Sequence, residues 1–381
     1  MVSSPPPIVR EPSFHKQHDL MPFLVREILV ASSAYDAFLL DEDGRLDERL
    51  ISAYRGLSLS ATPRITHATS AARCLTLLAE RRFDLVLTVM RLEDTDAAEL
   101  SRRIKTMNPT IPVVLLAFDE MDRRNFPGGV LPATIDHVFL WTGDAQILIA
   151  AIKQVEDQRN AEADAQAAGV QVILVVEDSP RRYSTFLALL YAELMTQSHS
   201  LIAEGLNAMH RQMRMRARPK ILLAMTFEEA VKYYRKFQDH LLGVITDVRF
   251  PIGGVENAEA GFELVRLIRR ESTNLPVLMQ SADPGVAKPA TELSAWYVDK
   301  NSPTLHDELR SFLGHDIKAM VCTEKEMLKA LERYYSAGGE SVETLIANLE
   351  QDAELAATVE AIEKNATLDL TSVEALADSA P

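Results

Sequence analysis

Five polar residues in the second half of the chain stand where apolar runs end. They are Glu177, Asp178, Asp247, Ser281 and Lys300. Carboxylates held close together repel one another, and a divalent cation resolves that conflict. Mg²⁺ favours oxygen ligands and keeps several waters for an incoming phosphate, while lysine and serine side chains can donate to an anion. These residue types therefore predict a magnesium-assisted socket for a phosphoryl group carried on a carboxylate, provided that they meet.

The apolar runs that carry these residues are predicted to belong to a set of strands at 170–179, 219–225, 241–247, 275–282 and 295–300. Amphipathic segments with apolar residues at three- and four-residue spacing separate them. Alternation of strands and helices, with strands that are apolar throughout, favours a parallel sheet covered on both faces. Because chemistry in an open parallel sheet collects at the carboxyl ends of the strands, the polar residues are expected at one edge.

The first half of the chain repeats this order. Its predicted strands cover 26–33, 64–68, 83–89, 111–118 and 135–141. The fourth strand shows the shared register, because Ala117 follows Pro112 by the same interval as Ser281 follows Pro276. A duplication explains this repeat, so the sequence predicts an α/β protein with two flavodoxin-like (CheY-like), doubly wound domains of five parallel strands each.

The second half resembles the receiver domain of two-component response regulators. The motifs that carry the resemblance are the acidic pair "ED" (177–178), "DVRFP" (247–251), "SA" (281–282) and "YVDK" (297–300). They stand at the ends of four different strands, in the order that the family uses. The resemblance implies a phosphorelay protein whose only catalysis is its own phosphorylation and dephosphorylation.

The resemblance also implies who donates the phosphoryl group and who holds the metal. Asp247 is the expected phosphoacceptor, and its expected donor is a sensor histidine kinase or a histidine phosphotransfer protein. Asp178 and Asp247 are expected to bind Mg²⁺ directly, Glu177 to support it through water, and Arg249 to offer its backbone carbonyl.

Three further residues inherit roles in switching. Lys300 is expected to pair with one phosphoryl oxygen and Ser281 to hydrogen-bond another, while Tyr297 changes rotamer to follow Ser281. The face formed by the last two strands and the helix between them is the expected readout. One departure concerns the residue after the lysine, which is Asn301 where receivers usually have proline. The geometry of that loop is therefore less constrained by the resemblance.

The first half has lost the same chemistry. The matching positions hold Ser32, Ser33, Val89, Ala117 and Trp141, so neither an acidic pair nor a phosphoacceptor remains. This copy is predicted to be a pseudo-receiver that binds neither Mg²⁺ nor phosphate. The stretch "DEDGRLDE" (41–48) is not a calcium loop, because its glycine would place leucine at the first and twelfth ligand positions.

The predicted organisation is a disordered leader (1–22), the pseudo-receiver (23–155), a stiff helical connector (156–169), the receiver (170–314) and an acidic helical tail (315–381). The receiver's first helix is unusually long, at 180–216, and bears an apolar stripe that includes Leu187, Leu190 and Leu194. Three interpretations stay open. The stripe packs on the pseudo-receiver, the segment folds back as a hairpin at Gly205, or the stripe pairs with a second chain to form a homodimer.

Composition excludes several other classes of function. The net charge of −15 disfavours a surface for nucleic acid, and the one dense basic run, "RQMRMRARPK" (211–220), is interpreted as a solvated helix face. No apolar run approaches the length of a membrane span. The two cysteines, Cys74 and Cys322, lack metal-ligand spacing and indicate a reducing compartment. A cytoplasmic protein, without nucleic-acid or membrane partners, is the expectation.

Residues 24–313 also resemble the front end of bacterial proteins with a phosphoenolpyruvate (PEP) synthase-like region downstream. The tail here shows no Gly-rich nucleotide loop and no catalytic histidine motif. Three hypotheses follow. The leading one is a response regulator that signals through protein contacts to an output protein, which could be PEP synthase-like. The others are a phosphorylation-independent scaffold and the regulatory component of a PEP synthase-like enzyme on another chain.

Overall fold

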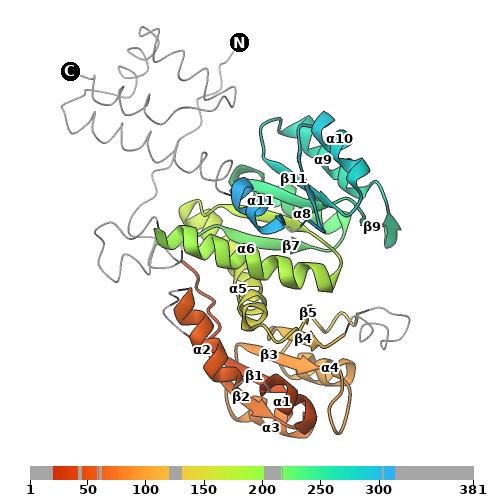
Figure 1. The fold of residues 1–381 in the computed structure, drawn as a ribbon. Helices are drawn as coiled ribbons and strands as arrows, with labels where there is room; N and C mark the ends of the chain where they lie inside the picture. The colour runs from red at the N-terminus through yellow and green to blue at the C-terminus, as the bar shows by residue number, and fades with distance from the viewer. Residues whose placement is uncertain are drawn as a thin grey trace, which may run out of the picture.

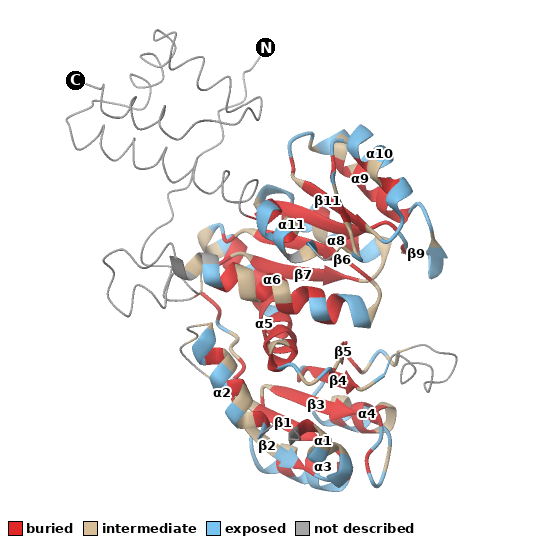
Figure 2. Cartoon of the chain, in the orientation of Figure 1, coloured by how far each residue is buried: buried red, intermediate tan, exposed pale blue. Residues whose placement is uncertain are grey.

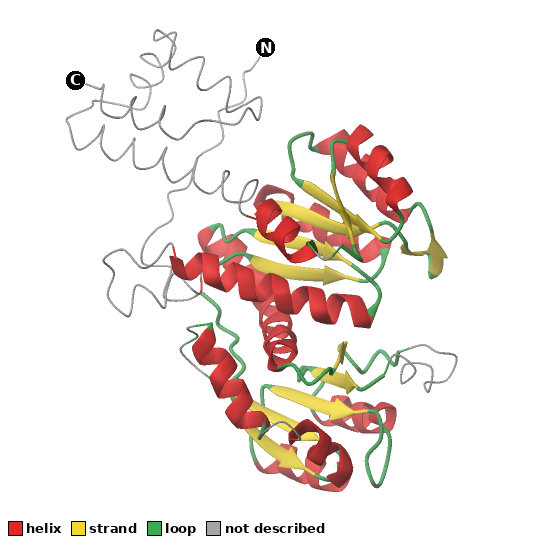
Figure 3. Cartoon of the chain, in the orientation of Figure 1, coloured by secondary structure: helices red, strands yellow, loops and turns green. Residues whose placement is uncertain are grey.

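A computed structural model describes residues 20–41, 45–57, 59, 62–119, 131–200, 216, 218–302 and 304–313. Within them the chain forms two α/β domains in succession, each built on one parallel sheet of five strands (Figures 1 and 3). Both sheets have the same order when their strands are numbered along the chain, with the second strand at one edge and the fifth at the other. This is the doubly wound, flavodoxin-like order that the sequence predicts.

The N-terminal sheet has the order β2-β1-β3-β4-β5. Its strands are β1 (Glu27–Ala31), β2 (Arg64–Ala68), β3 (Leu85–Val89), β4 (Val113–Ala117) and β5 (His137–Leu140). The helices around it are α1 (Ala34–Asp41), α2 (Leu46–Gly56), α3 (Ala71–Glu80), α4 (Ala97–Met107) and α5 (Ala145–Ala168). Each strand lies inside the range predicted for it.

The C-terminal sheet has the order β12-β11-β8-β6-β7. Its strands are β6 (Val172–Val176), β7 (Lys220–Ala224), β8 (Leu241–Asp247), β11 (Val277–Ser281) and β12 (Trp296–Asp299). The helices around it are α6 (Pro180–Ser200), α8 (Phe227–Phe237), α9 (Ala260–Glu271), α10 (Ala287–Glu292) and α11 (Leu305–Phe312), with short 3₁₀ turns η4 (Gln238–His240) and η5 (Pro284–Val286). The main strands again match the predicted ranges.

One element of the C-terminal domain was absent from the prediction. An antiparallel hairpin, β9 (Phe250–Ile252) paired with β10 (Val255–Asn257), follows β8 directly. Its turn uses Gly253 and Gly254, both with positive φ. The hairpin stands away from the body of the sheet in Figure 1.

Helix α5 joins the domains and is buried along most of its length (Figure 2). Asp144 caps its start by accepting from the Gln146 amide, and Gly169 ends it with a φ of 65°. The predicted connector at 156–169 is helical, yet the boundary at 155 falls inside one continuous helix. The second half of α5 is therefore a packed part of the fold, rather than a spacer between two domains.

A ladder of polar side chains on α5 holds the segment that precedes β1. Glu156, Asn160 and Asp164, spaced one helical turn apart, accept from the amides of Val25, Phe23 and Met21 at 2.9–3.0 Å. Residues two apart in the extended segment before β1 therefore bond to residues four apart on α5, because both sets of groups face the same side. This contact orders residues 21–25 against α5.

The two domains cover each other's edge strands. Helix α5 packs along β7, where Asp157 accepts from the Ile221 amide at 2.9 Å. Helix α6 packs against β5, where Ser184 accepts from the Leu140 amide at 2.9 Å. Helices α5 and α6 also pack on each other. Each domain therefore supplies a helix that satisfies edge groups of its neighbour's sheet.

A buried charge pair stands at the centre of this contact. The two guanidinium nitrogens of Arg218 lie 2.7 and 2.8 Å from the Asp157 carboxylate, and Tyr191 donates to Asp157 at 3.0 Å. Lys220 lies 3.1 Å from Asp164. Buried pairs of this kind are costly to break, because removing one partner leaves an uncompensated charge.

The apolar stripe on the long helix packs inside this chain. Leu187, Leu190 and Leu194 are buried and belong to one core with residues of both domains. The interpretation that the stripe packs on the N-terminal domain is correct for this part. These leucines are not free to pair with a second chain, so the described residues give the predicted homodimer no support. The rest of the predicted helix, 201–215, lies outside the described residues.

Two other predictions concern segments that the structure does not describe. The leader (1–22), apart from residues 20–22, and the acidic tail (315–381) lie outside the described residues. Among the helices that are described, none combines the length and apolar character needed to cross a bilayer.

Candidate functional site

Alternation along the strands directs three polar side chains to one face of the C-terminal sheet. Glu177, Asp247 and Lys300 each stand at or just beyond the carboxyl end of a strand. The residues two positions earlier all belong to a single apolar core: Val175, Ile245 and Val298. Because side chains alternate with a period of two, the polar residues continue the same face. The parallel register brings them together at one edge.

The ammonium of Lys300 joins two of the carboxylates. Its Nζ lies 2.5 Å from Glu177 Oε2 and 2.6 Å from Asp247 Oδ2, and the lysine side chain is only 6% exposed. The asparagine at 301 does not turn it outward, because the Asn301 amide donates to Asp299 and closes a local turn. The loop after β12 therefore delivers the charge inward without the proline that receivers usually have.

Backbone amides orient the same two carboxylates. Ser179 donates to Glu177 Oε1 at 3.1 Å, and Val248 donates to Asp247 Oδ1 at 2.6 Å. Each carboxylate thus has one oxygen on an amide and the other on the lysine. Such double anchoring limits the rotation of both groups.

A third carboxylate, that of Asp178, completes an acidic cluster. Glu177, Asp178 and Asp247 each offer one oxygen, and these oxygens all lie within 4.8 Å of one another. Opposite ligands of Mg²⁺ at ~2.1 Å are about 4.2 Å apart, so this spacing fits one cation after small adjustments. The oxygen-only donor set also suits Mg²⁺. The side chain of Arg249 is exposed, 3.9 Å from Glu256, and the role of its carbonyl stays a prediction.

Burial changes the acidity of Glu177. Burial raises its pKa, Lys300 lowers it and Asp247 raises it, with a net pKa of about 7. The raised pKa means that burial disfavours the ionised form of Glu177. A bound cation would favour that form, because metal ligands must be deprotonated.

Ser281 and Tyr297 lie beside the cluster and contact each other. The amide of Lys300 donates to the Ser281 carbonyl at 3.0 Å, which places Ser281 next to the lysine. Its hydroxyl accepts from the Asp283 amide at 3.1 Å, and the Tyr297 hydroxyl donates to the carbonyls of Ser281 and Asp283 at 3.4 and 3.2 Å. Tyr297 of β12 is therefore hydrogen-bonded to the end of β11, where Ser281 lies, and to the turn that follows it.

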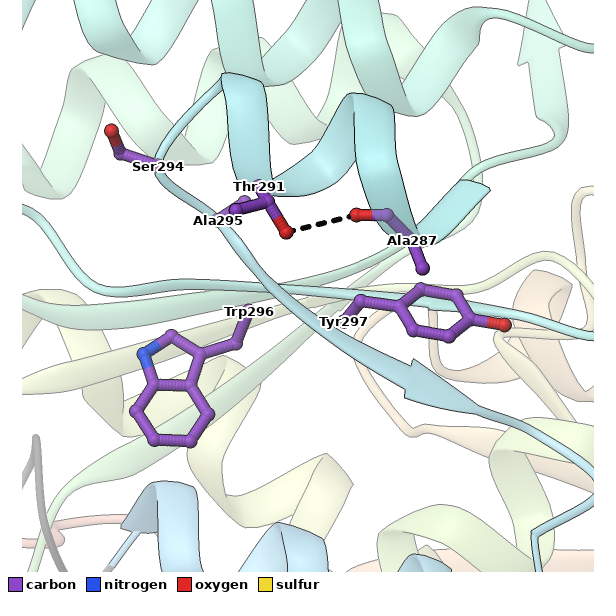
Figure 4. A pocket seen from close by; sticks show the side chains of 6 residues that line it. All are labelled: Ala287, Thr291, Ser294, Ala295, Trp296 and Tyr297. Atoms are coloured by element: carbon purple, nitrogen blue, oxygen red, sulfur yellow. Dashed lines mark hydrogen bonds between the residues drawn. The ribbon is translucent and has the colours of Figure 1, made fainter. Parts of the chain in front are cut away.

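Tyr297 also lines a pocket. The pocket, of about 540 Å³, lies between α10 and β12 and includes Trp296, Ala287 and Thr291 (Figure 4). Trp296 is 46% exposed there. Trp296 packs on Phe312 on one side of β12, and Tyr297 faces α10 on the other, so Tyr297 is the aromatic residue on the predicted readout face.

Two residues near the cluster escaped the sequence interpretation. A Cβ on Gly261 would lie 2.3 Å from the Asp247 carbonyl oxygen, so only glycine fits there. Gln280 pairs with Asp247 in the register of β11 and β8, is buried, and its Nε2 has no hydrogen-bond partner. Gly261 could have been noticed in the sequence as a glycine at the start of an amphipathic helix. Gln280 could have been noticed as an amide side chain inside an otherwise apolar strand.

The N-terminal domain lacks the corresponding site. Val89 and Ala117 are buried apolar residues at the strand ends, and Trp141 lies under the Arg49 guanidinium at 5.7 Å from its ring centre. Ser32 is buried and its hydroxyl has no hydrogen-bond partner, while Ser33 accepts from the Asp36 amide and donates to its carboxylate. Among the described residues of this domain no acidic cluster suited to a cation occurs.

No protein-family model matches the chain, and no curated protein matches it. Solved structures that it resembles include the receiver domain of an HD domain-containing protein from Pseudomonas fluorescens (23% identity, 37% of this chain and 93% of that chain, TM-score 0.27). Another is the receiver domain of a sensor histidine kinase from Pseudomonas aeruginosa, with magnesium in its cleft (16%, 35% and 98%, TM-score 0.26). A third is a probable response regulator/GGDEF domain protein (17%, 77% and 98%, TM-score 0.32).

These likenesses are too low to bear on function, and the fold rests on the strand order described above. The likeness to PEP synthase-like proteins has no support among these findings and stays a prediction.

Proposed function

We propose that the C-terminal domain is a two-component receiver that accepts a phosphoryl group on Asp247 with the help of Mg²⁺. The observation that carries this proposal is the convergence of Lys300 on Glu177 and Asp247, with Asp178 beside them. A structural ion pair needs one carboxylate for one ammonium. An excess of buried carboxylates at the carboxyl edge of a parallel sheet is better explained by a cation.

The residues divide the chemistry among them. Asp247 attacks the phosphorus of a phosphohistidine, so that a P–O bond forms while the P–N bond breaks and the imidazole nitrogen keeps the electron pair. Glu177, Asp178, Asp247 and the Arg249 carbonyl would hold Mg²⁺, which neutralises charge on the phosphoryl oxygens when bound. Lys300 exchanges carboxylate contacts for a phosphoryl oxygen, at the same edge where it now lies.

The same proposal covers partners and output. A sensor histidine kinase or a histidine phosphotransfer protein supplies the phosphoryl group. Phosphorylation adds about −1.5 to −2 charges at Asp247, and the hydrogen-bonded residues Ser281 and Tyr297 are the ones expected to respond. The N-terminal domain acts as a pseudo-receiver, signalling passes through protein contacts, and the chain has no enzymatic activity beyond its own phosphorylation and dephosphorylation.

The test is phosphorylation of the full chain by acetyl phosphate, followed by intact mass. With Mg²⁺ the protein should gain the mass of one phosphoryl group. The gain should vanish without Mg²⁺ and in Asp247→Asn. Asp94→Asn is the matched control, because Asp94 is an acid in the loop after β3 of the N-terminal domain, and this variant should be phosphorylated like the wild type.

An alternative is a scaffold that keeps the acidic cluster without using it. The ion pairs of Lys300 already balance much of the negative charge, which is the observation that favours this alternative. A wild type that gains no mass, and whose spectra do not change with Mg²⁺ and beryllofluoride, would establish the scaffold and refute the receiver.

A further inference from the structure

The acidic loop of the C-terminal domain continues without interruption into helix α6. Glu177 and Asp178 are followed by Ser179, and α6 begins at Pro180. The Ser179 amide donates to Glu177, and the Ser179 carbonyl accepts from the amides of Arg182 and Tyr183 at 3.0 Å. One residue therefore hydrogen-bonds both to the acidic cluster and to the first turn of the helix.

That first turn is bonded to the other domain. The Tyr183 hydroxyl donates to the Val138 carbonyl, and Ser184 Oγ accepts from the Leu140 amide at 2.9 Å. The ring of Tyr183 also meets Phe139 edge to face, with 5.7 Å between ring centres. Both Tyr183 and Ser184 are buried. Three consecutive residues of β5 thus contact two consecutive residues of α6.

The hydrogen bonds between β5 and α6 fix the position of Tyr183 and Ser184. Strand β5 is the edge of its sheet, and its outward amide and carbonyl need partners when they are buried. Ser184 uses its single proton on the Pro180 carbonyl at 2.5 Å, so its oxygen is oriented to accept from Leu140. A shift of the turn by one residue would break every one of these contacts. The N-terminal domain therefore holds the start of α6 in one position.

We propose that the N-terminal domain positions the metal-binding loop of the C-terminal domain, with Tyr183 and Ser184 as the positioning residues. The inference rests on the proposed function, because it assigns a task to this contact only if Glu177 and Asp178 bind a cation. Strand β6 holds the loop from one side and the docked turn holds it from the other. A domain without an acidic cluster of its own thus contributes to the affinity of its neighbour's site.

Thermodynamic linkage makes the proposal testable from both ends. If docking at β5 favours the loop geometry that binds Mg²⁺, then Mg²⁺ must favour docking by the same factor. Metal affinity should fall when the docking bonds are removed. Conversely, the Leu140 amide should exchange its proton more slowly when the acidic cluster is occupied, because that amide is bonded to Ser184.

The experiment titrates Mg²⁺ alone into the full chain by calorimetry. Ser184→Ala and Tyr183→Phe should each weaken Mg²⁺ binding about fivefold or more, the lower end of typical coupling between sites. In the wild type, Mg²⁺ with beryllofluoride should slow exchange of the Leu140 amide by a similar factor. Thermal unfolding of every variant checks that it is folded; if Ser184→Ala is not, Tyr183→Phe and the exchange measurement decide.

Two matched controls separate positioning from general destabilisation. Thr185→Ala changes the next residue of α6, which is exposed and bonds only weakly to Arg181 at 3.5 Å. Tyr191→Phe removes a buried bond between the domains from the same helix, about two turns beyond Ser184 and farther from the acidic loop. Both variants should bind Mg²⁺ as the wild type does, even though Tyr191→Phe unfolds more easily.

The outcomes are distinguishable. If the wild type does not bind Mg²⁺, the proposed function fails and the inference fails with it. If the wild type binds Mg²⁺ but Ser184→Ala and Tyr183→Phe bind it equally well, or if Tyr191→Phe weakens binding as much as they do, only the inference is overturned.

Discussion

The two domains have one strand order and opposite chemistry at the carboxyl ends of their strands. In the N-terminal sheet Val89 stands beside Leu116, whereas in the C-terminal sheet Asp247 stands beside Gln280 in the same register. At the carboxyl ends of the strands, apolar side chains pack together in the N-terminal domain, whereas ion pairs form in the C-terminal domain. The fold therefore does not depend on the acidic cluster, and function resides in a site carried by the fold.

The outermost strand on the β5 side of the first sheet also differs in exposure from its counterpart, β12, in the second sheet. The first residue of β5, His137, is 4% exposed, while Trp296 at the same place in β12 is 46% exposed. Helix α6 covers β5, and no second domain in the described chain covers β12 in that way. One domain thus uses its fifth strand for internal docking, and the other presents it to the outside.

The largest effect is expected from copying a residue of the N-terminal domain into the site. Gly261 donates its amide to Val248, as Ala97 does to Met90 in the other domain. Gly261→Ala would place a Cβ against the Asp247 carbonyl and displace the acceptor, so phosphorylation by acetyl phosphate should slow about 100-fold. Ala97→Gly is the reciprocal control and should leave the rate unchanged. An unaltered rate in Gly261→Ala would show that the loop yields without harm to the site.

A second change removes the Lys300 ammonium, which has no counterpart at the strand ends of the N-terminal domain. Lys300→Met leaves the carboxylates of Glu177 and Asp247 without their ammonium, so the protein without Mg²⁺ should lose about 3 kcal/mol of stability. Mg²⁺ should restore part of that loss, which urea unfolding with and without the ion would measure. The pair of Glu193 with Arg310, whose side chain is 55% exposed, supplies the control, because Arg310→Met should cost at most about 1 kcal/mol. Equal losses in the two variants would contradict the account of the cluster.

A third change tests the unpaired amide beside Asp247. Gln280→Leu copies Leu116 and removes a buried group without a hydrogen-bond partner, so stability should rise by about 1 kcal/mol in urea unfolding. Leu116→Gln, the reverse change, should destabilise the N-terminal domain. A loss of stability in Gln280→Leu would mean instead that the amide makes a bond that the cluster needs.

The last prediction concerns the effect of acid on the covered edge strand β5. Burial, opposed in part by the hydrogen bond to Gln158, lowers the pKa of His137. The unfolded chain therefore takes up this proton first, and stability should fall below about pH 6.5, by up to ~1.4 kcal/mol per pH unit from this group. Denaturation between about pH 7.5 and 5.5 measures the slope, which should be shallower in His137→Gln. The same slope in both proteins would rule out His137 as its source.

The strand order and the positions of the site residues could be predicted from the sequence, because both depend on local patterns. Apolar runs gave the strands, and the carboxyl ends of parallel strands share an edge, so Glu177, Asp247 and Lys300 had to lie near one another. Even the inward direction of Lys300 follows from its parity with Val298.

Contacts between distant segments could not be predicted in this way. The bond from Leu140 to Ser184 and the pair of Asp157 with Arg218 join residues whose types are ordinary on a helix surface. Only the packing of α5 against α6 turns them into interior groups. The hairpin β9–β10 was missed because its strands are short and partly exposed, which leaves little apolar pattern to detect.

The mutual covering of edge strands has a consequence for the evolution of the chain. A cut at residue 155 would divide α5 and uncover both β5 and β7, and bare strand edges recruit other chains into aggregates. Neither domain could therefore be removed or exchanged by recombination without harming the other. The N-terminal domain would be retained for its surface, even though its strand ends carry no acidic cluster.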